Sequence, residues 1–358
     1  MNRQRLLTTF LRLAQVDSPS HAETNLAQLL TREFAELGWQ VHTDSSGNVI
    51  ASLAGDSQQA PLLFASHMDV VMPCLGVRPK VTDGVIHSSG ETVLGADAKA
   101  SIAAMLEAAA ALPGKHPPIE FVFTVGEEVG HLGAKALDIS ALKAEQAWVL
   151  DGLVPVGTII VAAPTYYSFV AKVHGRAAHA GVEPERGISA IAVAAEAIAQ
   201  LHWGRLDTTT TANIGTILGG SVRNAVPAEL ELEGEVRSLA EDRAADVAAN
   251  IETTFTEVAR HNGAELDFQL VRQYAGYTLS DDEPVVTRAR QAFEKLDPGG
   301  SQLVTSGGGS DANEFNGRGL RACVLGIGAE GCHSVAERIS LDQLELLTSW
   351  LLKMLEPD

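Results

Sequence analysis

The stretch Pro61–Val71, PLLFASHMDVV, decides the fold. Its continuous apolar run, Leu62–Ala65, is typical of a strand that is buried on both faces of an α/β sheet. The run stops at His67 and Asp69, and side chains two positions apart in an extended chain point to the same side. Ligands and catalytic groups of open α/β sheets gather at the carboxyl ends of strands, and a histidine held by a carboxylate is a frequent zinc ligand. A lone His-x-Asp is a weak signal, so the hypothesis of a metal site depends on where the later strands end.

Carboxylates stand at the ends of the later strands. Asp97 lies where a loop leads into an Ala-rich helix, a position at which a helix N-cap is the common alternative. The apolar run Ile119–Val125 is followed by Glu127 and Glu128, and adjacent like charges repel unless a cation lies between them. A further run ends in Asp151. One imidazole and five carboxylates therefore converge on one edge of the sheet, which is ligand chemistry for two divalent cations.

Composition narrows the class of protein. The 358 residues exceed what one core usually serves, so two domains are expected. A formal net charge of −19 argues against nucleic acid or an anionic membrane as a partner. The sequence has no apolar run of the ~18 residues that a membrane-spanning helix needs, and no signal peptide. The three cysteines have no paired spacing, which suits a reducing compartment, so we expect a cytoplasmic protein.

Helices and loops are expected around these strands in the first half. Ser20 and Glu23 have the spacing of a capping box, and Gly38 marks the end of the helix that follows. The segment 73–93 reads as a surface loop. The run 147–150 reads as the last strand of this half.

From Tyr166 the pattern changes. Strands and helices are predicted in the order βαββαβ, the split-βαβ or ferredoxin-like unit, at 167–174, 187–202, 212–218, 229–238, 241–261 and 266–273. Glutamates at alternate positions of the fourth segment predict a sheet with one solvated face. The helix at 187–202 could form a dimer interface or only cover its own sheet. We therefore expect an inserted domain over 166–280.

After the insert the chain returns to the first pattern, with a helix near 283–296, an apolar strand at 322–327 and a final helix at 341–355. The strand leads to His333. The first domain is thus expected to be discontinuous, formed by 1–165 and 281–358.

The ordered set His67-Met68-Asp69, Gly95-Ala96-Asp97, Gly126-Glu127-Glu128, Asp151 and His333 resembles the M20 family of dinuclear zinc peptidases over essentially the whole chain. Gly126–Gly130 and Gly307–Asn313 resemble its peptidase T-like (tripeptide aminopeptidase) branch. The resemblance implies a three-layer α/β zinc-exopeptidase catalytic domain. It also implies that the inserted ferredoxin-like domain is a lid through which the protein forms a homodimer.

The resemblance also implies two divalent metal ions, zinc in the first place and cobalt or manganese as alternatives. The implied ligands are five side chains: His67 and Asp151 for one ion, Glu128 and His333 for the other, and Asp97 bridging both. Asp69 would orient His67, and Glu127 would be the general base. A cis peptide bond is expected between Asp97 and Ala98.

Substrate contacts are implied by resemblance as well. His179 would stabilise the tetrahedral oxyanion from a partner subunit, and a solvent-exposed histidine is the alternative. Asn224 and Arg237 would hold the substrate from the lid, although Arg237 could equally pair with a nearby glutamate. The glycine loop at Gly308 would approach the substrate backbone closely. As a separate hypothesis, which the resemblance does not supply, we expect Asp311 to receive a substrate amine.

The implied activity is removal of the N-terminal residue of short peptides by a metal-activated water, since two cations polarise the carbonyl and acidify water. The aspartate at 151 resembles the aminopeptidase members more than the deacylase members. An amidohydrolase or carboxypeptidase acting on N-acyl amino acids stays open, because specificity is set by loop contacts. A non-catalytic binding protein on the same scaffold is also possible, but the intact Glu127 speaks against it.

Overall fold

The structure, a computed structural model, describes residues 1–112 and 114–357. The chain forms two compact units: the first comprises Met1–Ala162, Thr278–Ser306 and the residues from Ser310 onward, and the second comprises Ala163–Tyr277 and Gly307–Gly309. Both units mix helices and strands, so the predicted α/β class is confirmed. The expected insert, 166–280, has bounds close to those of the second unit.

The stretch quoted first forms the centre of the main sheet in the first unit. Strand β3 (Leu62–His67) is buried along its whole length, as predicted, and lies between β6 (Ile119–Thr124) and β7 (Gln146–Gly152). It runs parallel to both, and β16 (Arg321–Gly326) runs parallel to β7. The carboxyl ends of these four strands therefore meet at one edge.

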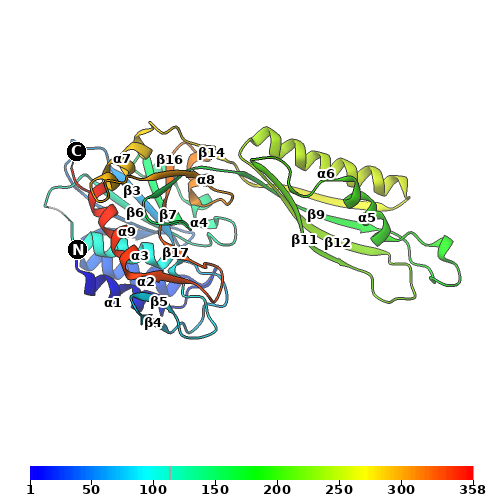
Figure 1. Ribbon diagram of the computed structural model, residues 1–358, viewed down its shortest axis with the longest axis horizontal. Coiled ribbons are helices and arrows are strands. Elements are labelled where there is room, and N and C mark those ends of the chain that lie inside the picture. The colour runs from blue at the N-terminus through cyan, green and yellow to red at the C-terminus, as the bar shows by residue number, and fades with distance from the viewer. Residues whose placement is uncertain (113, 358) are drawn as a thin grey trace. The chain divides into compact units, whose positions relative to one another are not determined.

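The main sheet has nine strands. Beyond the central four, its members are β1 (Gln40–Thr43), β2 (Val49–Leu53), β8 (Thr158–Ala163), β14 (Tyr277–Thr278) and β15 (Gln302–Thr305), in the order β1-β2-β6-β3-β7-β16-β8-β14 with β15 paired to β8. Figure 1 shows the central strands with helices on both sides of them.

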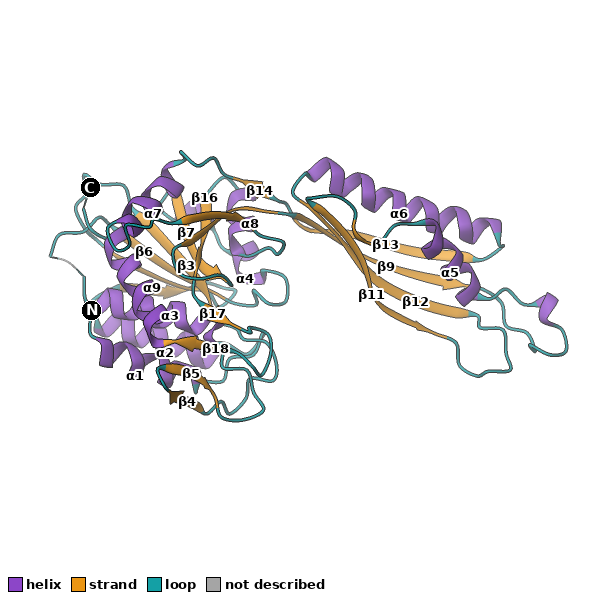
Figure 2. Cartoon of the chain, viewed as in Figure 1, coloured by secondary structure: helices purple, strands orange, loops and turns teal. Residues whose placement is uncertain are grey.

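Helices cover both faces of this sheet, so the first unit has three layers (Figure 2). They are α1 (Arg3–Ala14), α2 (Thr24–Glu36), α3 (Ala96–Ala110), α4 (Leu132–Ala136), α7 (Pro284–Glu294), α8 (Asp311–Gly317) and α9 (Leu341–Met354). The alternation of side chains assigns the faces. Ser66 of β3 bonds to Ala98 in α3, whereas Thr124, which stands beside the next β3 residue, bonds to Asp311 in α8. The starts of α3 and α8 thus lie on opposite faces.

Two strand predictions were wrong. The segment 73–93, expected to be a loop, contains β4 (Pro79–Thr82) and β5 (Val85–Ser88). They join β17 (Ala329–Glu330) and β18 (Arg338–Ser340) in a separate four-stranded sheet. Strands β4 and β5 pair with each other as a hairpin through Asp83 and Gly84, whose φ values of +49° and +78° suit a two-residue turn, so a local signal was present and was overlooked. The other two strands come from the far end of the chain.

The run 147–150 is not the last strand of the first half. Strand β8 follows it and is fully buried. Only Pro164 separates β8 from β9, the first strand of the second unit, so the two apolar runs look like one in the sequence. The helix and strand positions predicted for the rest of the first unit agree with the structure within a few residues.

The capping box expected before α2 is also wrong. Glu23 is the N-cap of α2, but its side chain makes no cap bond. Its Oε1 instead accepts hydrogen bonds from the main-chain N–H of Gly126 at 3.0 Å and of His21 at 3.1 Å. The Ser20 hydroxyl donates to Asp69 at 2.8 Å. The two residues therefore serve other segments of the chain.

The second unit has the predicted order of elements, with one short strand added. Its elements are β9 (Thr165–His174), α5 (Ala190–Gln200), β10 (Gly204–Arg205), β11 (Thr210–Gly219), β12 (Glu229–Ser238), α6 (Glu241–His261) and β13 (Glu265–Tyr274). The five-stranded sheet has the order β10-β11-β12-β9-β13 and is antiparallel throughout. This is the order of a ferredoxin-like sheet with β10 appended.

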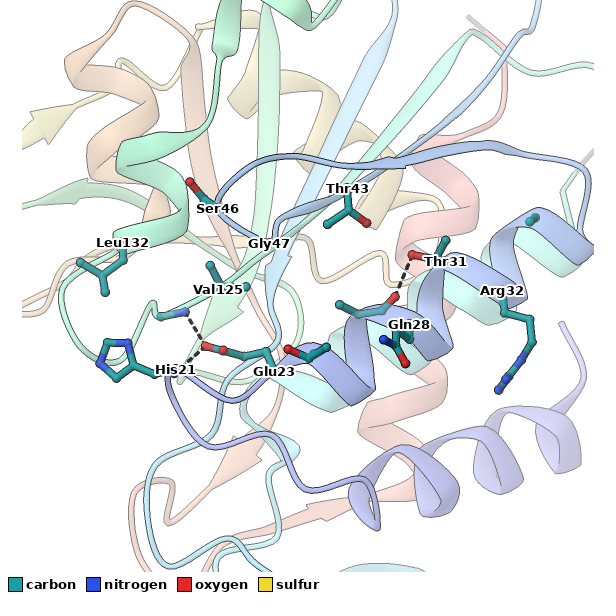
Figure 3. A pocket seen from close by; sticks show the side chains of 14 residues that line it. His21, Glu23, Gln28, Thr31, Arg32, Thr43, Ser46, Gly47, Val125 and Leu132 are labelled. Atoms are coloured by element: carbon teal, nitrogen blue, oxygen red, sulfur yellow. Dashed lines mark hydrogen bonds between the residues drawn. The ribbon is translucent and has the colours of Figure 1, made fainter.

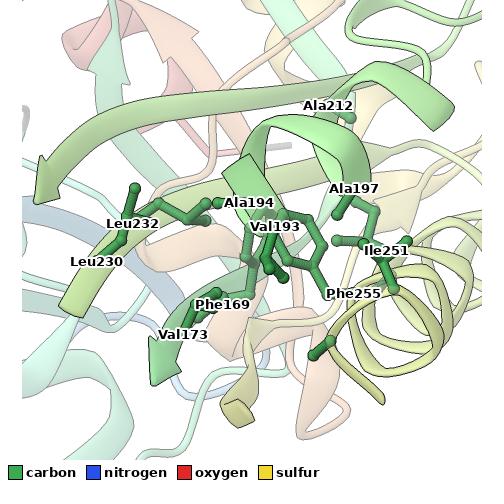
Figure 4. Close-up of a cluster of buried hydrophobic side chains, with 14 of the residues drawn as sticks. Phe169, Val173, Val193, Ala194, Ala197, Ala212, Leu230, Leu232, Ile251 and Phe255 are labelled. Carbon is green, nitrogen blue, oxygen red and sulfur yellow. The ribbon is translucent and has the colours of Figure 1, made fainter. Parts of the chain in front are cut away.

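The core of the second unit lies between this sheet and its two helices. Phe169 and Leu232 of the sheet meet Val193 of α5 and Phe255 of α6, all buried (Figure 4). The opposite face of β12 carries the alternate glutamates, as predicted for a solvated face. No helix among residues 1–112 and 114–357 is both long and apolar enough to cross a membrane.

Candidate metal centre and active site

The edge at which the four parallel strands end brings the predicted ligands together. His67 is the last residue of β3, Asp151 lies near the end of β7, and Glu128 follows β6. Asp97 comes from the start of α3, where its backbone departs from helical geometry. His333 lies on the loop between β17 and β18 and has a left-handed backbone, with φ of +60°.

Asp97 stands between two pairs of side chains. Its Oδ1 lies 3.1 Å from Nε2 of His67, which in turn lies 3.3 Å from Oδ1 of Asp151. Its Oδ2 lies 3.3 Å from Nε2 of His333, which lies 3.1 Å from Oε1 of Glu128. Each oxygen of one carboxylate therefore faces a different imidazole–carboxylate pair. The peptide bond between Asp97 and Ala98 is cis, as expected.

These side chains could hold metal. One donor atom each from His67, Asp97 and Glu128 lie within 4.8 Å of one another, and so do donors from His67, Glu127 and Asp151. Imidazole nitrogens and carboxylate oxygens are the donors that zinc and similar divalent ions take in proteins. The residues present thus fit a metal ion. Glu127 lies close enough to His67 and Asp151 to contact a group bound between them.

The titration of the site reflects its surplus of negative charge. Hydrogen bonds to the Asp97 and Glu128 carboxylates raise the pKa of His333 to about 10. Burial raises the pKa of Asp151 to about 7. Burial, reinforced by the nearby Asp151 carboxylate, raises the pKa of Glu127 well above its ordinary range. Acids forced this close must be neutralised by protons or by a cation, and a divalent ion would take the place of the protons.

Asp69 links the end of β3 to the loop after β6. Its main-chain oxygen lies 2.9 Å from Nδ1 of His67, and its Oδ1 lies 3.4 Å from the same nitrogen. Its carboxylate accepts the main-chain N–H of Glu127 at 2.9 Å and of Glu128 at 3.2 Å. Asp69 therefore touches His67 as the resemblance implied, and it also fixes the backbone of the two glutamates.

A histidine that the sequence alone did not single out lies against Glu127. Nε2 of His131 is 3.4 Å from Oε1 of Glu127, and its Nδ1 is 3.6 Å from Oε1 of Glu314. His131 is buried and has φ of +56°. Its only signal in the sequence is its position four residues after Glu127.

Two predicted substrate residues lie on neighbouring segments of the second unit. His179 forms an isolated antiparallel bridge with Ala225, and the N–H of Ala180 donates to the oxygen of Asn224 at 3.0 Å. The N–H of Gly181 donates to Nδ1 of His179 at 3.2 Å. An imidazole that accepts at Nδ1 carries its proton at Nε2 when neutral, so Nε2 is the donor of this exposed histidine.

Arg237 is engaged within the second unit. Its Nε and Nη2 each lie 3.1 Å from an oxygen of Glu235, its Nη1 donates to the Tyr274 hydroxyl at 3.0 Å, and the guanidinium lies 4.2 Å from the ring centre of Tyr166. This is the ion pair considered as the alternative role. The glycine stretch that includes Gly308 belongs to the same unit.

Asp311 is almost completely buried in the first unit, at 1% exposure. Its Oδ2 accepts a hydrogen bond of 2.5 Å from the Thr124 hydroxyl. Its Oδ1 has no hydrogen-bond partner within residues 1–112 and 114–357. Burial is the main cause of the raised pKa values of Glu127 and Asp151, and the negative charge of Asp311 adds to both shifts.

Comparison with known proteins agrees with this geometry. The model of peptidase family M20/M25/M40 matches residues 63–356. The chain belongs to this family. All five implied ligands, together with Asp69 and Glu127, fall within the matched residues.

Relatives cover the M20 chain from end to end. It is 40% identical to YqjE of Bacillus subtilis (strain 168) over 367 residues, which are 99% of each chain. The crystal structure of aminopeptidase PepT from Bacillus cereus is similar with a TM-score of 0.91 and 38% identity, covering 99% of this chain and 98% of that one. A tripeptidase from Staphylococcus aureus is similar with a TM-score of 0.95 and 38% identity, at the same coverage.

A separate pocket of about 880 Å³ lies along α2 in this M20 protein (Figure 3). Its lining includes Val125 and Gly126, which immediately precede Glu127, and Figure 3 shows Glu23 bonded to the backbone there. None of the predicted site residues lines it in the described part of the chain.

Proposed function

We propose that the protein is a metal-dependent exopeptidase that removes the N-terminal residue of short peptides. The observation that carries the proposal is the position of Asp97, whose two oxygens face two separate imidazole–carboxylate pairs. Such a set suits two divalent ions. The similar structures of an aminopeptidase and a tripeptidase support peptides as the substrate.

Five side chains would hold the ions in this proposal: His67, Asp97, Glu128, Asp151 and His333. The ions would be zinc, with cobalt or manganese as alternatives, because nitrogen and oxygen donors accept all three. When bound, they would supply Lewis acidity that polarises the peptide carbonyl and makes water a better nucleophile.

Glu127 is the general base in this mechanism. Its raised pKa suits the task, because a more basic carboxylate takes a proton from water more readily and can return it to the leaving amine. Asp69 fixes the backbone N–H of Glu127, and His131 lies against its carboxylate. We assign to Nε2 of His179, on a partner subunit, the hydrogen bond to the tetrahedral oxyanion.

The remaining substrate contacts are assigned to four residues. The unpartnered Oδ1 of Asp311 supports a role in receiving the free N-terminal ammonium, because a buried carboxylate oxygen without a partner is costly. Arg237 and Asn224 would hold the rest of the peptide, with the guanidinium released from Glu235 or shared with it. Gly308 would let the peptide backbone approach closely.

We propose that two copies associate through the second unit. Strand β10 pairs with β11 only as far as Thr211 and Ala212, so the edge of β11 beyond them is unpaired in the described part of the chain. Ile217 and Leu218 on this edge are 52% and 71% exposed. An unpaired strand edge is a template for a second chain, and two identical edges related by a twofold axis satisfy each other. The free state of all three cysteines supports a cytoplasmic location.

Hydrolysis of a small panel tests the activity. We expect the protein loaded with Zn²⁺ or Co²⁺ to cleave Ala-Ala-Ala, with little activity on Ala-Ala, N-acetyl-Ala-Ala-Ala or N-acetylornithine. A chelator should abolish cleavage, and added metal should restore it. Cleavage of the acetylated compounds instead would assign the protein to the amidohydrolase alternative. No hydrolysis of any of the four compounds would favour a binding protein.

The Glu127→Gln variant tests the base. It should keep the metal content of the wild type, because Glu127 is not a ligand in the proposal, while kcat falls about 10²–10⁴-fold. Metal analysis and steady-state kinetics on the tripeptide measure both. Glu107→Gln is the control, since Glu107 is buried and pairs with Arg5 at 2.6 Å. A Glu127→Gln protein with substantial turnover would rule out the assignment.

The Asp311→Asn variant tests the amine contact. A neutral amide cannot pair with an ammonium group, so the ratio of kcat/KM for Ala-Ala-Ala over its N-acetyl form should fall at least about tenfold, as the loss of one charged hydrogen bond predicts. If activity drops while the ratio stays constant, Asp311 supports the fold and does not bind the amine.

The Leu218→Lys variant tests the dimer edge. Size-exclusion chromatography with light scattering should show a dimer for the wild type and a monomer for the variant, because the lysine places a charge in the joined sheet. Val271→Lys is the matched control, since Val271 is 51% exposed on β13, the other edge of the same sheet. Dissociation by the control alone would move the interface to β13.

A further inference from the structure

A buried glutamate outside the ligand set holds the segment that carries Asp97. Glu337 is 2% exposed, and both of its carboxylate oxygens accept main-chain hydrogen bonds. Oε2 accepts the N–H of Gly95 at 2.7 Å, and Oε1 accepts the N–H of Asp97 at 3.0 Å. The Glu337 carboxylate therefore holds the backbone on both sides of Ala96, directly at the residue that faces both imidazoles.

The segment needs such an acceptor. The first N–H groups of a helix have no partner within the helix. In α3 the helical backbone is also interrupted at Asp97 and Ala98, which have non-helical backbone angles. The N-cap, Gly95, has no side chain to supply the bond. Glu337 supplies it from a distant part of the sequence, and a carboxylate suits the positive end of a helix.

The same short turn carries both Glu337 and His333. Gly331 and His333 have φ of +64° and +60°, and the N–H of Glu337 bonds back to the oxygen of Ser334 at 3.1 Å. A Cβ at Gly331 would lie 2.9 Å from the oxygen of Ala336, so the turn closes tightly on itself. One turn thus presents an imidazole to the Asp97 carboxylate and a carboxylate to the Asp97 backbone.

We propose that Glu337 is a positioning residue that sets the place of Asp97 relative to His333, and thereby the affinity of the site for its metal ions. The inference rests on the proposed metal centre and deepens it. Another anion this close to a cluster of carboxylates is unfavourable by charge alone. The two hydrogen bonds from Gly95 and Asp97 to the Glu337 carboxylate offset this repulsion. Partners outside the ligand set commonly change metal affinity 10–100-fold.

Glu337→Gln is the main test. The amide has one acceptor and turns its NH₂ toward one of two N–H donors, so one bond becomes a clash of donors. Metal-free protein is titrated with Zn²⁺ against a chromophoric chelator, and amide exchange over residues 94–98 is followed without metal. We expect Zn²⁺ affinity to fall about 10–100-fold and exchange at 94–98 to speed up.

Glu120→Gln is the matched control. Glu120 is also buried, at 6% exposure, and its carboxylate accepts the N–H of Lys143 and of Ala144 at 3.0 Å. Both N–H groups bond to the same oxygen, Oε2, so a glutamine here can keep both bonds, and the variant controls for the loss of a buried carboxylate away from the ligands. Its Zn²⁺ affinity should equal that of the wild type. Glu337→Asp, which keeps the charge but is too short to reach both N–H groups, is the second variant and gives the measurement if Glu337→Gln does not fold.

The outcomes separate the two proposals. Weaker Zn²⁺ binding in either Glu337 variant, with Glu120→Gln unchanged, supports the positioning role. Wild-type affinity in a folded Glu337 variant, or equal losses in Glu337→Gln and Glu120→Gln, overturns that role and leaves the exopeptidase proposal in place. A wild-type protein that binds no Zn²⁺ while residues 94–98 still depend on Glu337 overturns the metal centre itself.

Discussion

The concentration of negative charge around Asp97 is the constraint on which the rest of the first unit depends. Like charges gathered in one site are tolerated only where the backbone cannot move away and where a positive group can enter. The structure meets the first condition with carboxylates that accept main-chain N–H groups. Asp69 holds the two glutamates after β6, Glu23 holds Gly126, and Glu337 holds Asp97. These hydrogen bonds hold the ligand loops through their backbone.

The parallel order of β6, β3, β7 and β16 explains why this charge collects at one place. Four strands that run the same way deliver their following residues to one edge, and apolar side chains on both faces leave that edge as the place for polar groups. Within the second unit, His179 lies on a loop, and Arg237 lies on β12 and is paired with Glu235.

The sequence was sufficient for elements whose signal is local. The buried strands, the helix–sheet order of the second unit and the residues at the strand ends could all be predicted, because apolar runs and their polar endings lie within a few residues of each other. The pairing of β5 with β18 could not, since β18 is distant in the chain, although the Asp83-Gly84 turn between β4 and β5 is itself a local hairpin signal. Glu23 was given the wrong role and Glu337 was missed for one reason: their partners are backbone groups of remote loops, and a residue type says nothing about a bond to a distant main-chain N–H.

The distribution of these residues along the chain has a consequence for biosynthesis. Ser20, Asp69, Asp97 and Glu128 leave the ribosome early, but His333 and Glu337 come near the end of the sequence. The second unit is almost continuous, so it can fold as soon as it has emerged. During that interval the acidic loops of the first unit have been synthesised, but the turn with His333 and Glu337 that holds Asp97 has not. The nascent protein therefore acquires its complete set of ligands only after the whole second unit has been made.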